Sequence, residues 1–321
     1  LSMSKLYCLG ELLIDFQSVG TASLKDTRQF VKNAGGAPAN VCVQAVKLGR
    51  QAAYLSMVGA DGFGDFLVET LNAEGVDTSH VRRTDKYDTS LAFVSFKENG
   101  EREFSFYRRA AADLHFSPDD FKDVSFAAGD VFEFGSVAVK TDIAAETHRY
   151  LIKKAKEAGA LVCFDPNLRF NLWESAGSLK AAVKEFLPYA DVVKAGADEL
   201  QFITGKSGDE GVRELLSAGV KLLLVTDGAN GAKLYTDKER CVCGGYKVKA
   251  ADTTGAGDSF FGAFISCLME QNALPENVNS LGREELEKML CFACKCGAFT
   301  TTRYGAIPAM GTKEEIDKAV K

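Results

Sequence analysis

The sequence lacks a long hydrophobic run, a basic cluster and a secretion signal. No apolar stretch in its 321 residues approaches the roughly 20 residues that a helix needs to cross a bilayer, and the N-terminus has no signal-peptide pattern. The net charge is -6 and lysine and arginine are not clustered, so neither a nucleic acid nor a membrane surface is an expected partner. We therefore expect a cytoplasmic protein that acts on small molecules.

Histidine is also scarce, and no clear metal-binding motif is present. The three histidines, at positions 80, 115 and 148, are far apart in the chain. The nine cysteines are odd in number and lie mostly in apolar runs, which is typical of reduced intracellular thiols. Two groups, Cys241–Cys243 and Cys291–Cys296, have no histidine nearby, so we interpret them as structural cysteines.

Short apolar runs alternate with helical patterns along most of the chain. The runs are nearly continuous, as expected for parallel strands buried on both faces, and they cover 5–9, 54–58, 130–134, 160–164, 191–194 and 222–226. Helices are expected from near Pro38 to Gly49, over 142–158 and after the capping box Thr312-x-x-Glu315. This alternation predicts an α/β fold with a doubly wound, mostly parallel sheet and helices on both faces.

Two segments, 12–31 and 89–110, depart from this alternation. Both contain strand-like patterns without a helical partner, and Asn99-Gly100 is a hairpin turn signal between 91–97 and 102–107. We predict that they form a small β lid over the site, within a single domain of residues 3–321. Leu1 and Ser2 precede Met3 and are interpreted as a cloning remnant.

The segment Asp252–Asp258 leads directly from a glycine-rich turn into an apolar helix. Gly255, Ala256 and Gly257 allow a tight turn whose backbone N–H groups point at an anion, because a helix N-terminus has unpaired donors and a positive dipole end. Asp258 could then accept the proton of an attacking hydroxyl. The alternative is that Asp258 only caps the helix.

A second glycine pair, Gly35-Gly36, precedes a helix that contains Asn40. Paired glycines allow a ligand to approach the backbone, and an Asn side chain can bind a polyol, although an ordinary loop-to-helix junction would have the same pattern. Gly205-Lys-Ser207 is not a P-loop, because position 200 is Leu where that motif needs glycine. No dinucleotide-binding fingerprint follows the first strand.

The two glycine segments together resemble the two signatures of the ribokinase-like (PfkB) carbohydrate kinases, in 35–67 and in 252–264. The resemblance extends from about Leu6 to Pro308. It implies a three-layer α/β/α fold with a β-sheet lid, ATP and Mg²⁺ as cofactors, and Asp258 as the catalytic base beside the backbone of Gly255, Ala256 and Gly257.

Within the family, the chain is most similar to bacterial-type fructokinases, in 104–113, 164–169 and 301–308. The resemblance places Arg169 near the path of the phosphate, although a structural ion pair would also explain that residue. The residues that it implies in sugar binding are Asp15, Gly35, Gly36, Asn40, Tyr107, Arg108, Asp113 and Asn167.

The resemblance also implies nucleotide and ion sites. The nucleotide residues are Thr226, Gly228, Gly231, Gly257 and Cys294, the last at a position where fructokinases often have Asn. A monovalent cation, expected to be K⁺, would lie near Asp252, Thr254, Thr302 and Gly305. Glu199 would organise Mg²⁺ through water, although Gly196 replaces an Asn that relatives usually carry.

The resemblance implies phosphorylation of the 6-hydroxyl of D-fructose. A kinase of 2-keto-3-deoxygluconate remains an alternative, because Tyr107-Arg108 resembles a pair that binds the carboxylate of that sugar acid, whereas Asp113 would repel it. A second alternative is a non-catalytic binding protein of the same fold, although such proteins typically lose the Gly257-Asp258 pair. The exposed edges of the lid predict a homodimer joined through it.

Overall fold

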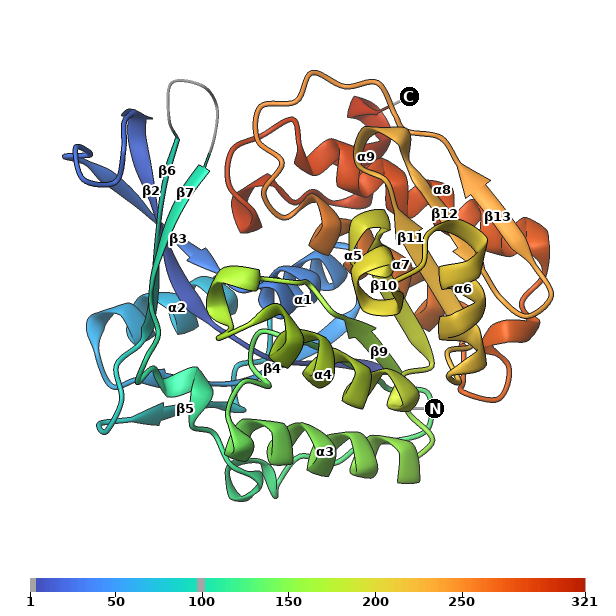
Figure 1. Ribbon diagram of the computed structural model, residues 1–321, viewed down its shortest axis with the longest axis horizontal. Coiled ribbons are helices and arrows are strands. Elements are labelled where there is room, and N and C mark those ends of the chain that lie inside the picture. Colours follow the sequence, from blue (N-terminus) through green and yellow to red (C-terminus); the bar gives the residue numbers. More distant parts are fainter. Residues whose placement is uncertain (1–3, 97–101, 321) are drawn as a thin grey trace.

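The computed structural model describes residues 4–96 and 102–320, and its largest element is a twisted sheet in the order β13-β12-β11-β10-β9-β8-β1-β4-β5 (Figure 1). Its strands are β1 (Lys5–Leu9), β4 (Gln51–Gly59), β5 (Val81–Thr84), β8 (Val131–Gly135), β9 (Leu161–Asp165), β10 (Val192–Gly196), β11 (Leu222–Thr226), β12 (Ala232–Tyr235) and β13 (Arg240–Cys243). The strands from β5 to β11 are parallel, and β12 and β13 are antiparallel. The predicted mostly parallel sheet is therefore confirmed, and all six predicted strands belong to it.

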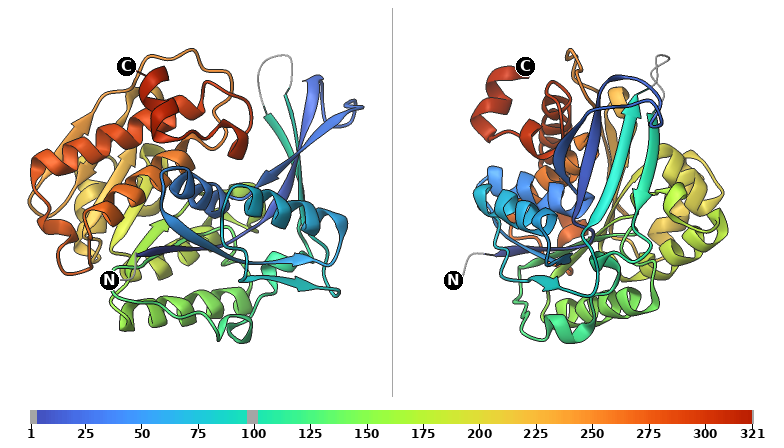
Figure 2. Two further views of the ribbon diagram at one scale, coloured as in Figure 1. Left: turned by 180° about the vertical axis from the view of Figure 1, so that it is seen from behind. Right: turned by 90° about the vertical axis from the view of Figure 1, so that its left-hand side faces the viewer.

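Helices cover both faces of this sheet (Figures 1 and 2). One face is covered by α3 (Asp142–Glu157), α4 (Ala176–Phe186), α5 (Ala197–Thr204) and α6 (Gly208–Ser217). The other face is covered by α1 (Ala37–Lys47), α2 (Gly62–Ala73), α7 (Ala256–Glu270), α8 (Arg283–Thr300) and α9 (Lys313–Ala319). No helix in the described ranges is long and apolar enough to cross a membrane.

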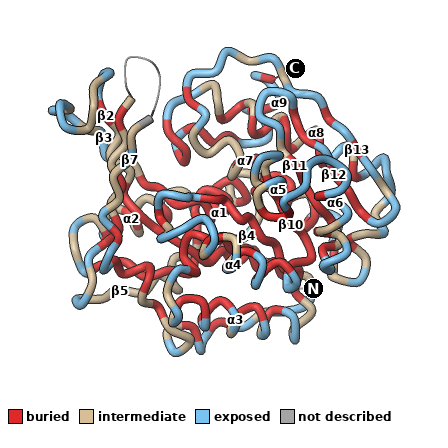
Figure 3. Tube along the Cα trace, in the orientation of Figure 1, coloured by how far each residue is buried: buried red, intermediate tan, exposed pale blue. Residues whose placement is uncertain are grey.

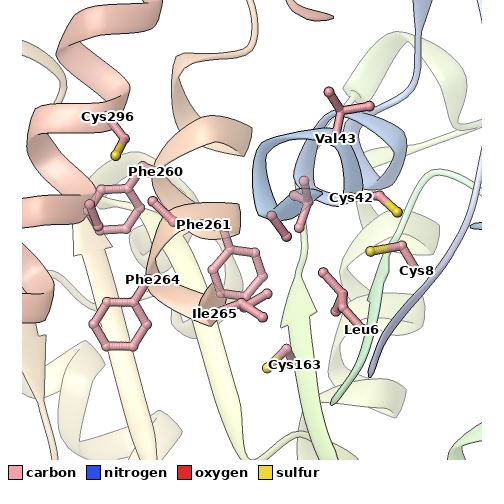
Figure 4. Close-up of a cluster of buried hydrophobic side chains, with 14 of the residues drawn as sticks. Leu6, Cys8, Cys42, Val43, Cys163, Phe260, Phe261, Phe264, Ile265 and Cys296 are labelled. Carbon is pink, nitrogen blue, oxygen red and sulfur yellow. The ribbon is translucent and has the colours of Figure 1, made fainter. Parts of the chain in front are cut away.

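The two apolar layers follow from the alternation of side chains along each strand. On β10, Val192 belongs to the layer under α7 and Val193 to the layer under α3 and α4. The sheet and the inner helix faces form the buried centre in Figure 3. Figure 4 shows the α7 side, where Phe261 and Ile265 point toward Leu6 and Cys163.

A second, four-stranded sheet projects beside this body in the order β3-β2-β6-β7 (Figure 2). We call it the lid sheet, and it consists of β2 (Leu13–Thr21), β3 (Phe30–Gly35), β6 (Ser90–Phe96) and β7 (Arg102–Tyr107). The smaller sheet was predicted in 12–31 and 89–110, but β3 continues to Gly35, beyond the predicted boundary. The predicted turn Asn99-Gly100 lies outside the described residues, as do Leu1 and Ser2.

Candidate active site

A cavity of about 720 Å³ lies between the lid sheet and the carboxyl ends of the central strands. Its walls come from β2, β3, the start of α1, the loop after β9, the start of α7 and residues 305–306. Ligands of open α/β sheets bind at the carboxyl ends of the strands, so the location itself indicates a functional site.

The N-terminus of α7 opens into this cavity. Gly255 precedes the helix with φ 76° and no side chain caps the helix start. A Cβ on Gly255 would lie 2.8 Å from the Cβ of Ala306, so this position requires glycine both for its backbone conformation and for space. The first turn of α7 thus presents backbone N–H groups and the positive end of the helix dipole to the cavity, which is suited to an anion.

Asp258 lies in this first turn and is held from α1. The Nδ2 of Asn40 donates a hydrogen bond to its Oδ2 at 2.8 Å. Burial raises the pKa of Asp258, against the opposing effects of Lys194, the hydrogen bond from Asn40, and Arg169. A carboxylate with a raised pKa beside an anion site is suited to accept a proton from a hydroxyl.

Three side chains with acceptor oxygens, those of Glu11, Asp15 and Asn40, line the part of the cavity where we expect the sugar. Oδ1 of Asn40 and Oε2 of Glu11 are buried without a hydrogen-bond partner, and both residues line the cavity together with Asp15. Burial raises the pKa of Asp15 to about 6, although Arg169 opposes this effect. Unpaired buried acceptors are costly, so their presence at a cavity wall indicates a ligand that brings hydroxyl donors.

Both predicted glycines of the first signature make room for these acceptors. A Cβ on Gly35 would lie 2.1 Å from Oδ2 of Asp15. Gly36 has φ 128°, and its Cβ would lie 2.2 Å from the backbone oxygen of Glu11. The turn between β3 and α1 therefore depends on glycine at both positions.

Asn167 and Arg169 follow β9 and line the cavity. The backbone of Asn167 has φ 42° and donates to Oδ1 of Asp165 at 3.1 Å, which fixes the loop after the strand. The positive charge of Arg169 lowers the pKa of both Asp15 and Asp258.

Arg108, Asp113 and Tyr107 do not line this cavity. Nη2 of Arg108 and Oδ2 of Asp113 form an ion pair of 2.6 Å, with side chains 5% and 0% exposed. Ser90 joins them, donating to Asp113 and accepting from Arg108. Tyr107 is exposed at the edge of a separate hollow. Their charges still act on the cavity, because the positive charge of Arg108 opposes the rise in the pKa of the cavity residue Glu11 that burial causes.

The predicted ion-site residues fall into two groups. Glu199 lines the cavity, but its two oxygens accept hydrogen bonds from the backbone of Leu168 at 2.7 Å and of Gly196 at 2.8 Å. Asp252 accepts hydrogen bonds from Thr254 and, at 3.1 Å, from the backbone of Gly305.

Thr302 follows α8 in the same region, where the backbone N–H of Asp252 donates to the oxygen of Thr301. Among the described residues, no group of three His, Cys, Asp or Glu side chains could hold a metal. A monovalent cation would therefore depend mainly on backbone and hydroxyl oxygens.

Apart from Gly257, the predicted nucleotide residues are not part of the cavity wall. Thr226 ends β11, and Gly228 and Gly231 have φ 50° and 95° in the turn that follows. A Cβ on Gly231 would lie 2.2 Å from the oxygen of Cys243, and Cys294 of α8 contacts the Cys243 thiol. The structure thus brings these residues together around β13.

Three charged cavity or near-cavity residues were given no role from the sequence: Glu11, Asp165 and Lys194. Nζ of Lys194 and Oδ2 of Asp165 form a buried ion pair of 2.7 Å, and Lys194 lines the cavity. The sequence did contain a signal for Lys194, because it is a charged residue within the apolar run Val192–Gly196. A lysine in a buried strand needs a partner of opposite charge.

Comparison with known proteins agrees with this geometry. Residues 3–313 match the family described as pfkB family carbohydrate kinase. The chain is 40% identical to fructokinase-2 of Solanum lycopersicum over 317 residues, which are 98% of this chain and 95% of that protein. It is also similar to the crystal structure of a fructokinase with bound ATP from Xylella fastidiosa, with a TM-score of 0.90, 33% identity and coverage of 99% and 98%.

A fructokinase from Vibrio cholerae O395, solved with fructose, ADP and calcium ion, gives a TM-score of 0.89 and 33% identity over 100% of both chains. A double mutant of that enzyme was solved with fructose, ADP and potassium ion, at a TM-score of 0.88 and 32% identity, covering 100% and 99%. Since the family match spans nearly the whole chain and these relatives align over almost their full length, the chain belongs to the pfkB family of carbohydrate kinases.

Proposed function

We propose that this chain transfers the γ-phosphoryl group of ATP to the 6-hydroxyl of D-fructose. One observation carries the proposal: Asp258 lies between the open N-terminus of α7, which suits a phosphoryl group, and the buried acceptors of Glu11, Asp15 and Asn40, which suit sugar hydroxyls. The similarity to fructokinases over the full chain supports the choice of fructose.

In the proposed reaction, the sugar hydroxyl attacks the γ-phosphorus while its proton passes to the carboxylate of Asp258. A new O–P bond forms, the bond between the γ-phosphorus and the bridging oxygen breaks, and its electron pair leaves with ADP. The N–H groups of the first α7 turn stabilise the charge on the transferring oxygens. Asn40 holds Asp258 in place through its amide, and the lid sheet limits access of water to the cavity.

The pairing of Arg108 with Asp113 favours a neutral sugar over the alternative sugar acid. The guanidinium of Arg108 is already paired with Asp113, and the cavity wall carries the carboxyl groups of Glu11 and Asp15. A competition assay with labelled fructose separates the two substrates. Preferential phosphorylation of 2-keto-3-deoxygluconate would contradict the choice of fructose.

Mg²⁺ fits this site as an ion bound mainly by the phosphates of ATP and by water, and not by a full set of protein ligands. Glu199 retains lone pairs for a water ligand beyond its two backbone hydrogen bonds, and Mg²⁺ typically keeps several waters and binds substrate phosphates. When bound with ATP, the ion neutralises phosphate charge. The carboxylate of Glu199 would orient its water shell from the start of α5.

A monovalent cation, K⁺ in our proposal, would bind near Asp252, Thr254, Thr302 and Gly305, next to the α7 turn. Asp252 is buried, and its carboxylate already organises the backbone of Thr254 and Gly305. A cation at this position would stiffen the turn that holds the phosphoryl group.

The nucleotide base is proposed to lie along Thr226, Gly228, Gly231 and Cys294.

We further propose a homodimer joined through the lid sheets. Register pairs Asp15 with Asn33 and Gln17 with Val31, so exposed Val31 continues the face of the lid sheet that lines the cavity. Val19 and Phe104 are also exposed on this sheet. Light scattering after size exclusion tests the dimer, and a monomer at micromolar concentration would contradict it.

The free cysteines of the described chain support the proposed cytoplasmic location.

The experiment that tests the function is a spectrophotometric screen for ADP release with ATP and a panel of sugars, with and without K⁺. We expect ADP release that depends on fructose and yields fructose 6-phosphate. Absence of sugar-dependent ADP release from the folded protein would favour the non-catalytic alternative and overturn the proposal.

A further inference from the structure

A buried lysine lies directly beneath the candidate phosphoryl site. Lys194 is on β10, opposite Leu224 in the parallel register, so it shares the sheet face that α7 covers. Its Nζ would lie 3.2 Å from a Cβ on Gly257. The ammonium group therefore faces the first turn of α7 from the side of the central sheet. It lies close to the space that a side chain at position 257 would occupy.

The surroundings keep this ammonium charged. Burial lowers the pKa of Lys194, but Asp165, Glu199 and Asp258 raise it, so that it is above its ordinary value. Its side chain is 8% exposed and donates a hydrogen bond to Oδ2 of Asp165 at 2.7 Å. Burying a charged lysine costs free energy of folding unless nearby negative charges stabilise it.

The pair with Asp165 alone does not explain the position of the lysine. Asp165 also accepts a hydrogen bond from the backbone of Asn167, while the charge of Lys194 favours the ionised form of Asp258 more than any other group around that carboxyl. Glu199 acts in the opposite direction, and Arg169 in the same direction as Lys194. The ammonium is thus shared between a structural carboxylate and the candidate base.

We propose that Lys194 is a positioning residue for phosphoryl transfer, whose fixed positive charge keeps Asp258 ionised and strengthens the anion site at the start of α7. The inference rests on the proposed kinase function. The lysine acts from behind the helix, through the backbone of Gly257 and the carboxylate of Asp258, and is not itself the proton acceptor.

A second lysine–aspartate pair lies at the amino ends of β10 and β11, where the lysine side chain is 34% exposed. Nζ of Lys221 and Oδ1 of Asp191 are 2.8 Å apart, just before β11 and β10, and Lys221 also donates to the oxygen of Pro275. This pair is outside the cavity wall. Lys221→Met is therefore a control, because it removes an ion pair at the end of a strand without changing the cavity wall.

The test compares Lys194→Met, Lys194→Arg, Lys221→Met and the double variant Lys194→Met/Asp165→Asn. The double variant removes the Asp165 carboxylate that the single variant would leave without its lysine, so it serves if the single variant fails to fold. We expect kcat of the double variant to fall about 10- to 1000-fold on the acid side of the pH–rate profile, because an opposite charge near a carboxyl group lowers its pKa by roughly 1–3 units. The acid limb of its pH–rate profile should move to higher pH by the same roughly 1–3 units.

KM for fructose and the affinity for ADP, measured by calorimetry, should change little, since neither depends on the γ-phosphoryl site. Lys194→Arg should recover part of kcat, and Lys221→Met should keep the wild-type rate. A folded double variant with wild-type kcat and an unmoved acid limb would overturn the role of Lys194. Absence of fructose-dependent ADP release from the wild type would instead overturn the proposed function.

Discussion

The two glycine-rich helix starts, of α1 and of α7, look alike in the sequence but differ in the structure. The N-terminus of α1 is already occupied, because Oε1 of Glu11 accepts a hydrogen bond from the backbone of Ala37 at 3.0 Å. The N-terminus of α7 has no side-chain cap and opens into the cavity. A helix start becomes an anion site only when no carboxylate of the protein fills it.

The two helices nevertheless act as one unit. Asn40 of α1 donates to Asp258 of α7, and Ser259 donates to Oε1 of Gln44 at 2.9 Å. A Cβ on Gly262 would lie 2.6 Å from the backbone oxygen of Val41, so the helices pack at very short range. The helix with the occupied start therefore holds the candidate base Asp258 of the open one.

The largest expected effect concerns the acidic residue of the open helix start. Asp258→Ala should lower kcat by about 10²–10⁴, the usual loss for a general base, with fructose binding largely retained. The matched control is Asp61→Ala, because Asp61 caps α2 through the backbone of Phe63 and Gly64. That control should lose about 1 kcal/mol of stability and keep its rate. Near-normal turnover of Asp258→Ala would show that Asp258 is not the general base.

The next effect concerns the contact between the helices. Gly262→Ala forces a methyl group against Val41 and the Cβ of Gln44, and overpacking of this kind costs about 1–3 kcal/mol. Gly177→Ala is the control, since Gly177 is an exposed helical glycine whose Cβ would meet only Ser175 at 3.7 Å. Urea unfolding should separate the two variants. Equal stability would mean that the close packing of α1 and α7 contributes little.

A smaller effect is expected at the occupied helix start. Glu11→Ala removes the acceptor of the Ala37 N–H and should cost about 1 kcal/mol, as losing an N-cap does. Glu11→Gln keeps an acceptor oxygen and should be closer to the wild type in thermal unfolding. If both variants are equally destabilised, the charge and not the hydrogen bond stabilises the start of α1.

The smallest effect is a shift in pH dependence. Burial raises the pKa of Asp15 to about 6, so acidification through this pH protonates the carboxylate and kcat/KM should fall. In Asp15→Asn the remaining acid limb should lie at lower pH, because a negative charge near Asp258 is gone and ionisation of Asp258 is easier. Profiles of kcat/KM measured between pH ~5 and ~8 test this. An unmoved limb would indicate that Asp15 does not titrate in this range.

Much of the fold and part of the site were predictable because their signals are local. Apolar runs, helix caps such as Thr312 with Glu315, and the left-handed Gly205 at the end of α5 act over a few residues. The glycine turn before Asp258 made it a candidate base or a helix cap, and the family resemblance favoured the base. Arg108 and Asp113 were placed near the sugar, but their mutual pairing depends on how the lid sheet packs, which no local pattern encodes.

The sequence by itself determined the order of strands and helices, the positions that require glycine, and the family to which the chain belongs. Only the tertiary structure decided which helix start stays open, that Glu11 fills the other, and that Lys194 on β10 lies beneath Gly257 on α7. The physical reason is that hydrophobic periodicity and turn chemistry act between neighbours in the chain, whereas charge pairing depends on distances set by sheet order and register.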